Sequence, residues 1–155
     1  MSDGKYAFEK SKIIQGDCLE KMKLIPDGSI DMILADLPYG ITACKWDEII
    51  PFEPLWEQYK RVIKDNGAIV LTASQPFTSA LIMSNLKMFK YEWIWEKSKA
   101  SNYLHFKYQP MKTHENVLVF SKYPAAQNTA KKKYDLLTTI CLWRTLRQRC
   151  LQQCE

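Results

Sequence analysis

The sequence predicts an α/β fold, with a mostly parallel sheet and an antiparallel hairpin toward the C-terminus. Residues 30–35 and 68–73 are apolar runs, as expected for strands covered on both faces. Helical patterns precede both runs, and a strand–helix–strand order favours parallel pairing. Two alternating segments, 91–97 and 115–121, are typical of a hairpin.

The first predicted unit extends from residue 12 to residue 35. Residues 12–15 are β-prone and Gly16 interrupts them, so Asp17 is expected at the end of a strand. A helical pattern follows, with apolar side chains on one side at Leu19, Met22 and Ile25. Residues 26–29, Pro-Asp-Gly-Ser, form a turn before the apolar run 30–35.

The rest of the chain continues this alternation as far as residue 124. Residues 51–64 are predicted as a helix with an apolar side, ended by Asp-Asn-Gly at 65–67. Gln75 and Pro76 open another helix that extends to about residue 87. Beyond Pro124 a linker at 125–133 precedes a tail at 134–155, which is compatible with a helix through Leu136, Leu137, Ile140 and Leu146.

Composition limits the classes of protein that fit. The 155 residues are 46% hydrophobic and 25% charged, which suits one folded domain. No apolar run approaches the roughly 20 residues of a membrane span and no signal peptide is evident, so we expect a cytoplasmic protein that does not contact membranes. Five cysteines without a C-x-x-C pair predict free thiols and no metal site.

Charge divides the chain into two unlike parts. Residues 1–86 hold nine Lys or Arg against twelve Asp or Glu, whereas residues 87–155 hold thirteen against five. The basic part is suited to phosphate, although an ordinary solvated surface explains the charge equally well.

The stretch Asp36-Leu37-Pro38-Tyr39 follows directly on the run 30–35. Pro38 restrains the residue before it, so the Leu37 carbonyl is held in a defined direction beside the Asp36 carboxylate. Two acceptors and the flat ring of Tyr39 suit an exocyclic amine on a planar base. For these four residues alone, a strand followed by an Asx-Pro turn is the ordinary alternative.

Two predicted loops could also contact a ligand. Residues 41–47 are long enough to cover a ligand, as a lid does. Residues 98–114 interleave cations with aromatic rings, which suits a phosphate backbone and an unpaired base, although the rings could instead pack beneath the loop. The candidate DNA-binding residues in and beside this loop are Lys97, Lys99, Asn102, Tyr103, Lys107 and Lys112.

The order of these segments resembles the amino-methylating DNA methyltransferases whose catalytic tetrapeptide lies near the N-terminus. The family's tetrapeptide has an acid or small polar residue, two prolines and an aromatic, so only Leu37 departs from it. The resemblance extends from Ile13 to about Lys122. Its further matches are Gly16-Asp17, Ser29-Ile30-Asp31, Trp46-Asp47, residues 59–64 ahead of Gly67, Trp95-Glu96-Lys97 and residues 114–122.

The resemblance implies a partial Rossmann-like methyltransferase sheet and transfer of a methyl group from S-adenosylmethionine to a base flipped from double-stranded DNA. In that reaction Asp36 and the Leu37 carbonyl accept the amine hydrogens, Pro38 restrains Leu37, and Tyr39 stacks on the base. Asp17 and Cys18 are the residues expected at the cofactor. A leading Asp resembles the adenine-N6 enzymes more than the cytosine-N4 ones.

One part of the family's pattern is missing. The family binds its cofactor with a second, glycine-rich turn, and this sequence has no glycine after Gly67. We therefore expect a methyltransferase catalytic half at residues 1–124, followed by a linker and an atypical tail at 125–155. Such a half would have a smaller core and an uncovered sheet edge. We expect a truncated methyltransferase, inactive alone. The alternatives are one half of a split enzyme, whose second chain supplies the cofactor half, and a DNA-binding module without catalysis.

Overall fold

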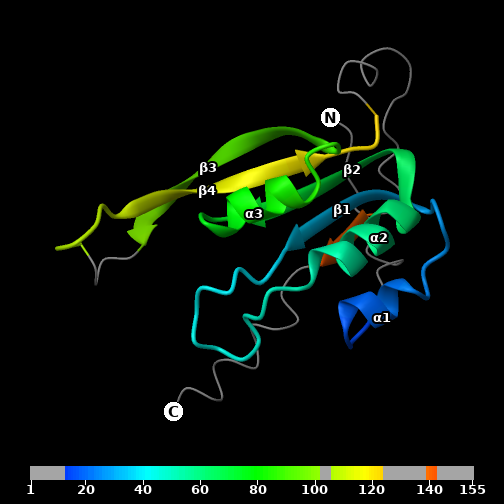
Figure 1. Cartoon of the computed structure of the whole chain (residues 1–155), viewed down its shortest axis with the longest axis horizontal. Helices are drawn as coiled ribbons and strands as arrows, with labels where there is room; N and C mark the ends of the chain where they lie inside the picture. Colours follow the sequence, from blue (N-terminus) through cyan, green and yellow to red (C-terminus); the bar gives the residue numbers. More distant parts are fainter. Residues whose placement is uncertain (1–12, 102–105, 124–138, 143–155) are drawn as a thin grey trace, which may run out of the picture.

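A five-stranded mixed sheet organises the computed structural model, which describes residues 13–101, 106–123 and 139–142 (Figure 1). The strand order is β3-β4-β2-β1-β5. The elements in chain order are α1 (Cys18–Met22), β1 (Ile30–Asp36), α2 (Phe52–Val62), β2 (Ile63–Ala73), α3 (Phe77–Ser84), β3 (Phe89–Ser101), β4 (Lys112–Phe120) and β5 (Thr139–Leu142).

The centre of the sheet is the predicted parallel unit, in which α2 connects β1 to β2. These strands pair in parallel, with Asp36 opposite Thr72 at their carboxyl ends. β5 adds a parallel strand on the other side of β1, whereas β4 runs antiparallel to both β2 and β3. The α/β class, the parallel pair and the hairpin are therefore confirmed.

One face of the sheet carries the core. Leu55, Tyr59 and Val62 of α2 and Leu81 of α3 are fully buried in one cluster with the strands, and Figure 1 shows α2 and α3 in front of the sheet. Every second strand residue points into this cluster, because side chains alternate between the faces of a strand. These residues are Ile33, Ala35, Ile69, Leu71, Ala73, Leu118 and Phe120.

The opposite face differs from the prediction that the central strands are covered on both sides. Met32, Leu34, Val70 and Val117 remain partly exposed on it. The buried hydrophobic side chains of the described helices all belong to the cluster on the first face. Within the described ranges, the sheet therefore buries one face well and the other only in part.

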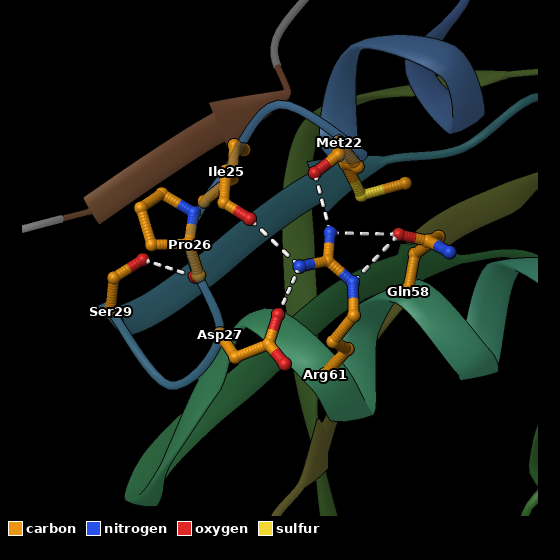
Figure 2. A network of polar contacts seen from close by, with 7 residues as sticks. All are labelled: Met22, Ile25, Pro26, Asp27, Ser29, Gln58 and Arg61. Atoms are coloured by element: carbon orange, nitrogen blue, oxygen red, sulfur yellow. Dashed lines mark hydrogen bonds and ion pairs between the residues drawn. The ribbon is translucent and has the colours of Figure 1, made fainter.

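Arg61, in the last turn of α2, ties the first helix and its turn to this core (Figure 2). Its guanidinium donates to the backbone oxygens of Met22 and Ile25 at 2.7 and 2.8 Å. It also forms an ion pair with Asp27 and two hydrogen bonds with Gln58. A planar group with five donors can serve several acceptors at once, so Arg61 fixes the connection between α1 and β1.

Two boundaries at the start of the sheet differ from the prediction. The described part of the strand predicted at 12–15 is irregular, and Ile13 is 93% exposed, because no strand within the described ranges pairs with it. The strand β2 begins at Ile63, directly after α2, and residues 65–67 lie within it. Its register with β1 shifts between Ile63 and Ala68, and a Cβ on Gly67 would lie 2.8 Å from the Asp31 carbonyl oxygen.

The hairpin and the tail also differ. β3 and β4 extend to Ser101 and from Lys112, so the loop between them is shorter than the predicted 98–114. Residues 139–142 form strand β5 rather than part of a helix, because the edge of β1 offers backbone partners to a short β-prone segment. The rest of the predicted tail helix lies outside the described residues. No helix in the described ranges is long and apolar enough to cross a membrane.

Candidate functional site

The candidate site lies where β1 and β2 end side by side. Asp36 is the exposed last residue of β1, and Thr72 is its buried register partner on β2. Thr72 Oγ1 donates to Asp36 Oδ1 at 2.5 Å, and the Tyr39 hydroxyl donates to the same oxygen at 2.9 Å. Among the described residues, both hydrogen bonds to this carboxylate end on Oδ1, which leaves Oδ2 to accept from a ligand.

Tyr39 lies partly buried beside this carboxylate. One side of its ring stacks against Phe77, at a centroid distance of 5.3 Å and an interplanar angle of 27°. Burial raises the pKa of the Tyr39 hydroxyl well above its ordinary value, and the nearby Asp36 and Glu115 carboxylates add to the shift. The hydroxyl therefore stays protonated at neutral pH and remains a donor to Asp36.

Leu37 and Pro38 connect Asp36 to Tyr39. The Leu37 side chain is 7% exposed and belongs to the hydrophobic core. This packing explains how the chain accommodates leucine where the related tetrapeptide has proline: the side chain contributes to the core while Pro38 still restrains the backbone. No described hydrogen bond ends on the Leu37 carbonyl, so its expected role as an acceptor stays a prediction.

The loop after Tyr39, predicted as a lid, is held by the buried Asp47 carboxylate. Its Oδ1 accepts from the backbone N–H groups of Tyr39 and Gly40 at 2.8 and 3.0 Å. Its Oδ2 accepts from the N–H groups of Ile41 and Thr42 at 2.9 and 2.7 Å, and from the Thr42 hydroxyl at 2.8 Å. Gly40 has φ of +67°, and a Cβ there would lie 2.9 Å from Ile49.

The hydrogen bonds also set the charge of this carboxylate. Burial alone would raise the pKa of Asp47, but the donors from Thr42, Gly40 and Ile41 outweigh burial and hold the pKa below its ordinary value. Asp47 is therefore ionised at neutral pH, and each of its hydrogen bonds is charge-assisted.

The hairpin of β3 and β4 brings part of the basic set to the same edge. Lys112 donates to Ser74, which follows β2, and Lys97 forms an ion pair with Glu115. Lys99 and Lys107 are exposed to solvent. Asn102 and Tyr103 lie outside the described residues. The structure thus brings Lys112 near the end of β2 and pairs Lys97 with an acid, and it leaves the DNA-binding role of the set a prediction.

The two expected cofactor residues lie at the start of α1. Asp17 does not end a strand; its Oδ1 caps the helix by accepting from the N–H groups of Leu19 and Glu20 at 2.9 and 3.1 Å. Cys18 is half-buried, and burial, together with the Asp17 charge, raises the pKa of its thiol. No hydrogen bond or ion pair among the described residues joins either residue to Asp36 or Tyr39.

Three residues of the site were missed by the sequence prediction: Thr72, Phe77 and Ser74. Thr72 and Ser74 lie at the carboxyl end of the predicted strand 68–73. This strand is expected to pair with the strand that ends at Asp36, and that expectation was the available signal. Their relation to Asp36 depends on the register between β1 and β2, which the sequence does not state. Phe77 lies at the start of a predicted helix, where only the tertiary fold brings it to Tyr39.

The sheet has a Rossmann-like methyltransferase fold, and solved structures share it. The PvuII DNA methyltransferase, described as cytosine-N4-specific, aligns with a TM-score of 0.54 at 14% identity, over 70% of this chain and 49% of that one. The complex of M1.HpyAVI with S-adenosylmethionine aligns with a TM-score of 0.53 at 20% identity, over 74% of this chain and 55% of that one.

A sequence relative points to the same class. The type II methyltransferase M.HinfI of Haemophilus influenzae is 32% identical over an alignment 112 residues long, and the match covers 56% of this chain and 31% of the relative. No family model matches the chain. The resemblance to the amino-methylating DNA methyltransferases is thus confirmed. The chain spans about a third of this curated relative and about half of the solved structures.

Proposed function

We propose that this chain is the base-binding catalytic part of a DNA methyltransferase that methylates the exocyclic amine of a flipped base. The observation that carries the proposal is the Asp36 carboxylate at the carboxyl edge of two parallel strands, where open α/β sheets bind ligands. Its Oδ1 is held by Thr72 and Tyr39 while Oδ2 faces no described donor. The similarity to M.HinfI supports the same assignment.

The chemistry follows from the weakness of the amine as a nucleophile. Its lone pair is delocalised into the base ring, so it must be turned toward the methyl donor. Asp36 and the Leu37 carbonyl accept its two hydrogens, and the base stacks on Tyr39, an interaction worth about 1–3 kcal/mol. The rate enhancement comes from alignment and from stabilising the positive charge that develops on the amine. No covalent intermediate with the protein is needed.

S-adenosylmethionine is the proposed methyl donor, and when bound it supplies a methyl group on a sulfonium, which is already a strong electrophile. The solved complex of M1.HpyAVI with this cofactor supports the choice. The exposed Asp17 carboxylate fits a cationic amino group or a hydroxyl, since only Oδ1 is used in capping α1. Asp17 and Cys18 would therefore hold the cofactor, without the glycine-rich turn that the described residues lack.

The proposed target is adenine N6. The leading Asp36 favours it, because the resemblance implies this acid more often in adenine enzymes. Cytosine N4 is the alternative, and the similarity of the fold to a cytosine-N4-specific enzyme favours it. The two bases present the same amine to Asp36, so the choice depends on the shape of the rest of the pocket.

A second polypeptide that completes the cofactor half is part of the proposal, as is double-stranded DNA. The partly exposed sheet face, with Leu34, Val70 and Val117, supports the second polypeptide, because parallel strands are normally covered on both faces. Asp36 and Thr72 belong to this face by register, so a layer packed there would adjoin the site. Exposed Trp93 continues the face onto β3.

The test is methyl transfer by the purified chain to unmethylated genomic DNA, with S-adenosylmethionine labelled on the methyl group. Mass spectrometry of the digested nucleosides separates N6-methyladenine from N4-methylcytosine. We expect no measurable transfer by the chain alone, and transfer that Asp36→Ala abolishes when the cofactor half of M.HinfI is added in trans. Transfer that survives Asp36→Ala would remove Asp36 from the mechanism, and robust transfer by the chain alone would show that no second part is needed.

The second candidate function is a DNA-binding module without catalysis, which the missing glycine-rich turn favours. It predicts salt-dependent DNA binding that ignores S-adenosylmethionine and survives Asp36→Ala and Tyr39→Ala. Calorimetry with the cofactor alone distinguishes the two functions, because only a methyltransferase half is expected to bind it.

A further inference from the structure

The segment that contains the candidate site is fixed at both of its ends. At one end Asp36 belongs to β1, whose backbone pairs with β2 through Thr72. At the other end four consecutive N–H groups, from Tyr39 to Thr42, all donate to the Asp47 carboxylate. Only Leu37 and Pro38 lie between these two anchors. The position of the Leu37 carbonyl therefore depends on both.

The Asp47 carboxylate has the burial and the hydrogen bonds needed to hold this segment. It is 7% exposed, and both of its oxygens are occupied: Oδ1 accepts two hydrogen bonds and Oδ2 accepts three. Successive N–H groups that converge in this way form a nest for an anion, and here the anion is a side chain of the same chain. An amide could not replace it, because its NH2 group would meet N–H donors where the carboxylate offers acceptors.

The first of these N–H groups belongs to a residue of the site itself. Tyr39 donates its backbone N–H to Asp47 and its side-chain hydroxyl to Asp36, so the two acids hold the tyrosine from two directions. The next donor, Gly40, adopts a φ of +67° that a side chain would disfavour. Glycine adopts this φ without strain, so the chain can turn here and bring four successive N–H groups to one carboxylate.

We infer that Asp47 is a positioning residue of the proposed methyl transfer: it holds the backbone from Tyr39 to Thr42, so that the Leu37 carbonyl and the Tyr39 ring keep their places beside Asp36. This inference rests on the proposed function. It assigns Asp47 no contact with the base or the cofactor, and it predicts that Asp47 affects the turnover of bound substrate more than cofactor binding.

The first measurement is amide hydrogen exchange in the wild-type chain and in Asp47→Asn. We expect the N–H groups of residues 39–42 to exchange at least tenfold faster in the variant, whereas those of residues 33–35 in β1 change less than twofold. The matched control is Glu48→Gln, which makes the same change of charge at the exposed neighbouring residue and should leave every rate unchanged. Unchanged exchange at residues 39–42 in Asp47→Asn would overturn the inference.

The second measurement separates positioning from a merely structural role. In the methyl-transfer assay, Asp47→Asn should lower kcat at least tenfold while KM for S-adenosylmethionine stays within twofold, with rates corrected for the folded fraction. Faster loop exchange with an unchanged kcat would restrict Asp47 to loop structure and overturn its role in the reaction. If the wild-type chain, supplied with the cofactor half, transfers no methyl group, the proposed function fails, whereas the exchange experiment still decides whether Asp47 holds the segment.

Discussion

Thr72 donates its hydroxyl to Asp36 across two parallel strands, with 2.5 Å between Oγ1 and Oδ1. The two residues are direct register partners, so the strand pairing itself sets their distance. Because the Tyr39 hydroxyl donates to the same oxygen, the carboxylate is held in one rotamer. The acid of the site is thus oriented by a residue outside its own tetrapeptide.

Replacing Thr72 by valine should slow methyl transfer without unfolding the chain. Valine keeps the branched shape and removes the hydroxyl, and a hydrogen bond to a charged group is worth about 1.5–3 kcal/mol. We expect kcat/KM to fall roughly tenfold or more, since about 1.4 kcal/mol corresponds to a factor of ten. Thr72→Ser, which keeps the hydroxyl, is the matched control. Equal rates for the valine and serine variants would show that the hydroxyl does not orient Asp36.

Leu37 should matter to stability through its side chain. Because that side chain belongs to the core, Leu37→Ala should lower the free energy of unfolding by about 2–3 kcal/mol, as cavity-forming substitutions do. Urea denaturation followed by tryptophan fluorescence measures the change. Leu24→Ala is the comparison, because Leu24 is 73% exposed and its truncation should change stability by less than about 0.5 kcal/mol. Similar losses for the two variants would contradict the packing of Leu37.

The central unit of the fold was predictable because its signals are local. The apolar run at 30–35 and the apolar side of α2, with Leu55, Tyr59 and Val62, depend only on neighbouring residues. Strand pairing is not local: the β-prone residues Ile13 and Ile14 pair with no described strand and are exposed, whereas residues 139–142 pair with the edge of β1.

The candidate site was likewise predictable only where its signals are local in the sequence. The tetrapeptide from Asp36 to Tyr39 identified the acid and the ring, because both stand next to a recognisable strand. Thr72 depends on register, and a slip of one residue would have turned its side chain to the other face. The match at Asp47 was visible in the sequence, but its five hydrogen bonds arise from a loop conformation that sequence patterns do not specify.

The basic residues of the hairpin should contribute unequally to DNA binding. Lys99 and Lys107 are exposed, so replacing either by alanine should reduce the slope of log K against log salt concentration by about 0.9. Lys97→Ala should change the slope less, because Glu115 already neutralises that charge. Fluorescence anisotropy with a labelled duplex at several salt concentrations gives the slopes. Lys23→Ala, which removes a cation paired with Glu20 on α1, is the control and should have no effect.

Arg61 should not be replaceable by lysine. A lysine ammonium cannot reproduce a planar fork that serves Met22, Ile25, Asp27 and Gln58 together. We expect Arg61→Lys to lower the free energy of unfolding by about 1–3 kcal/mol, because partly buried backbone oxygens of Met22 and Ile25 each lose a donor. Chemical denaturation measures this loss, and Lys60→Arg at the exposed neighbouring position should be neutral. A neutral Arg61→Lys would show that the network in Figure 2 adds little to stability.

The loop held by Asp47 should loosen in acid. The pKa of this carboxyl is held below its ordinary value of about 3.9 in the folded chain, although burial alone would raise it. A depressed pKa contributes stability that is fully present above the unfolded value and is lost as pH falls through the folded value. Protection of the N–H groups of residues 39–42 should therefore hold from neutral pH to about 5 and decline below about 4. Hydrogen exchange measured at each pH and corrected for its intrinsic pH dependence tests this, and in Asp47→Asn the acid-induced loss should disappear. A wild-type loop whose corrected protection does not change down to the pH at which the whole chain unfolds would show that Asp47 ionisation does not hold it.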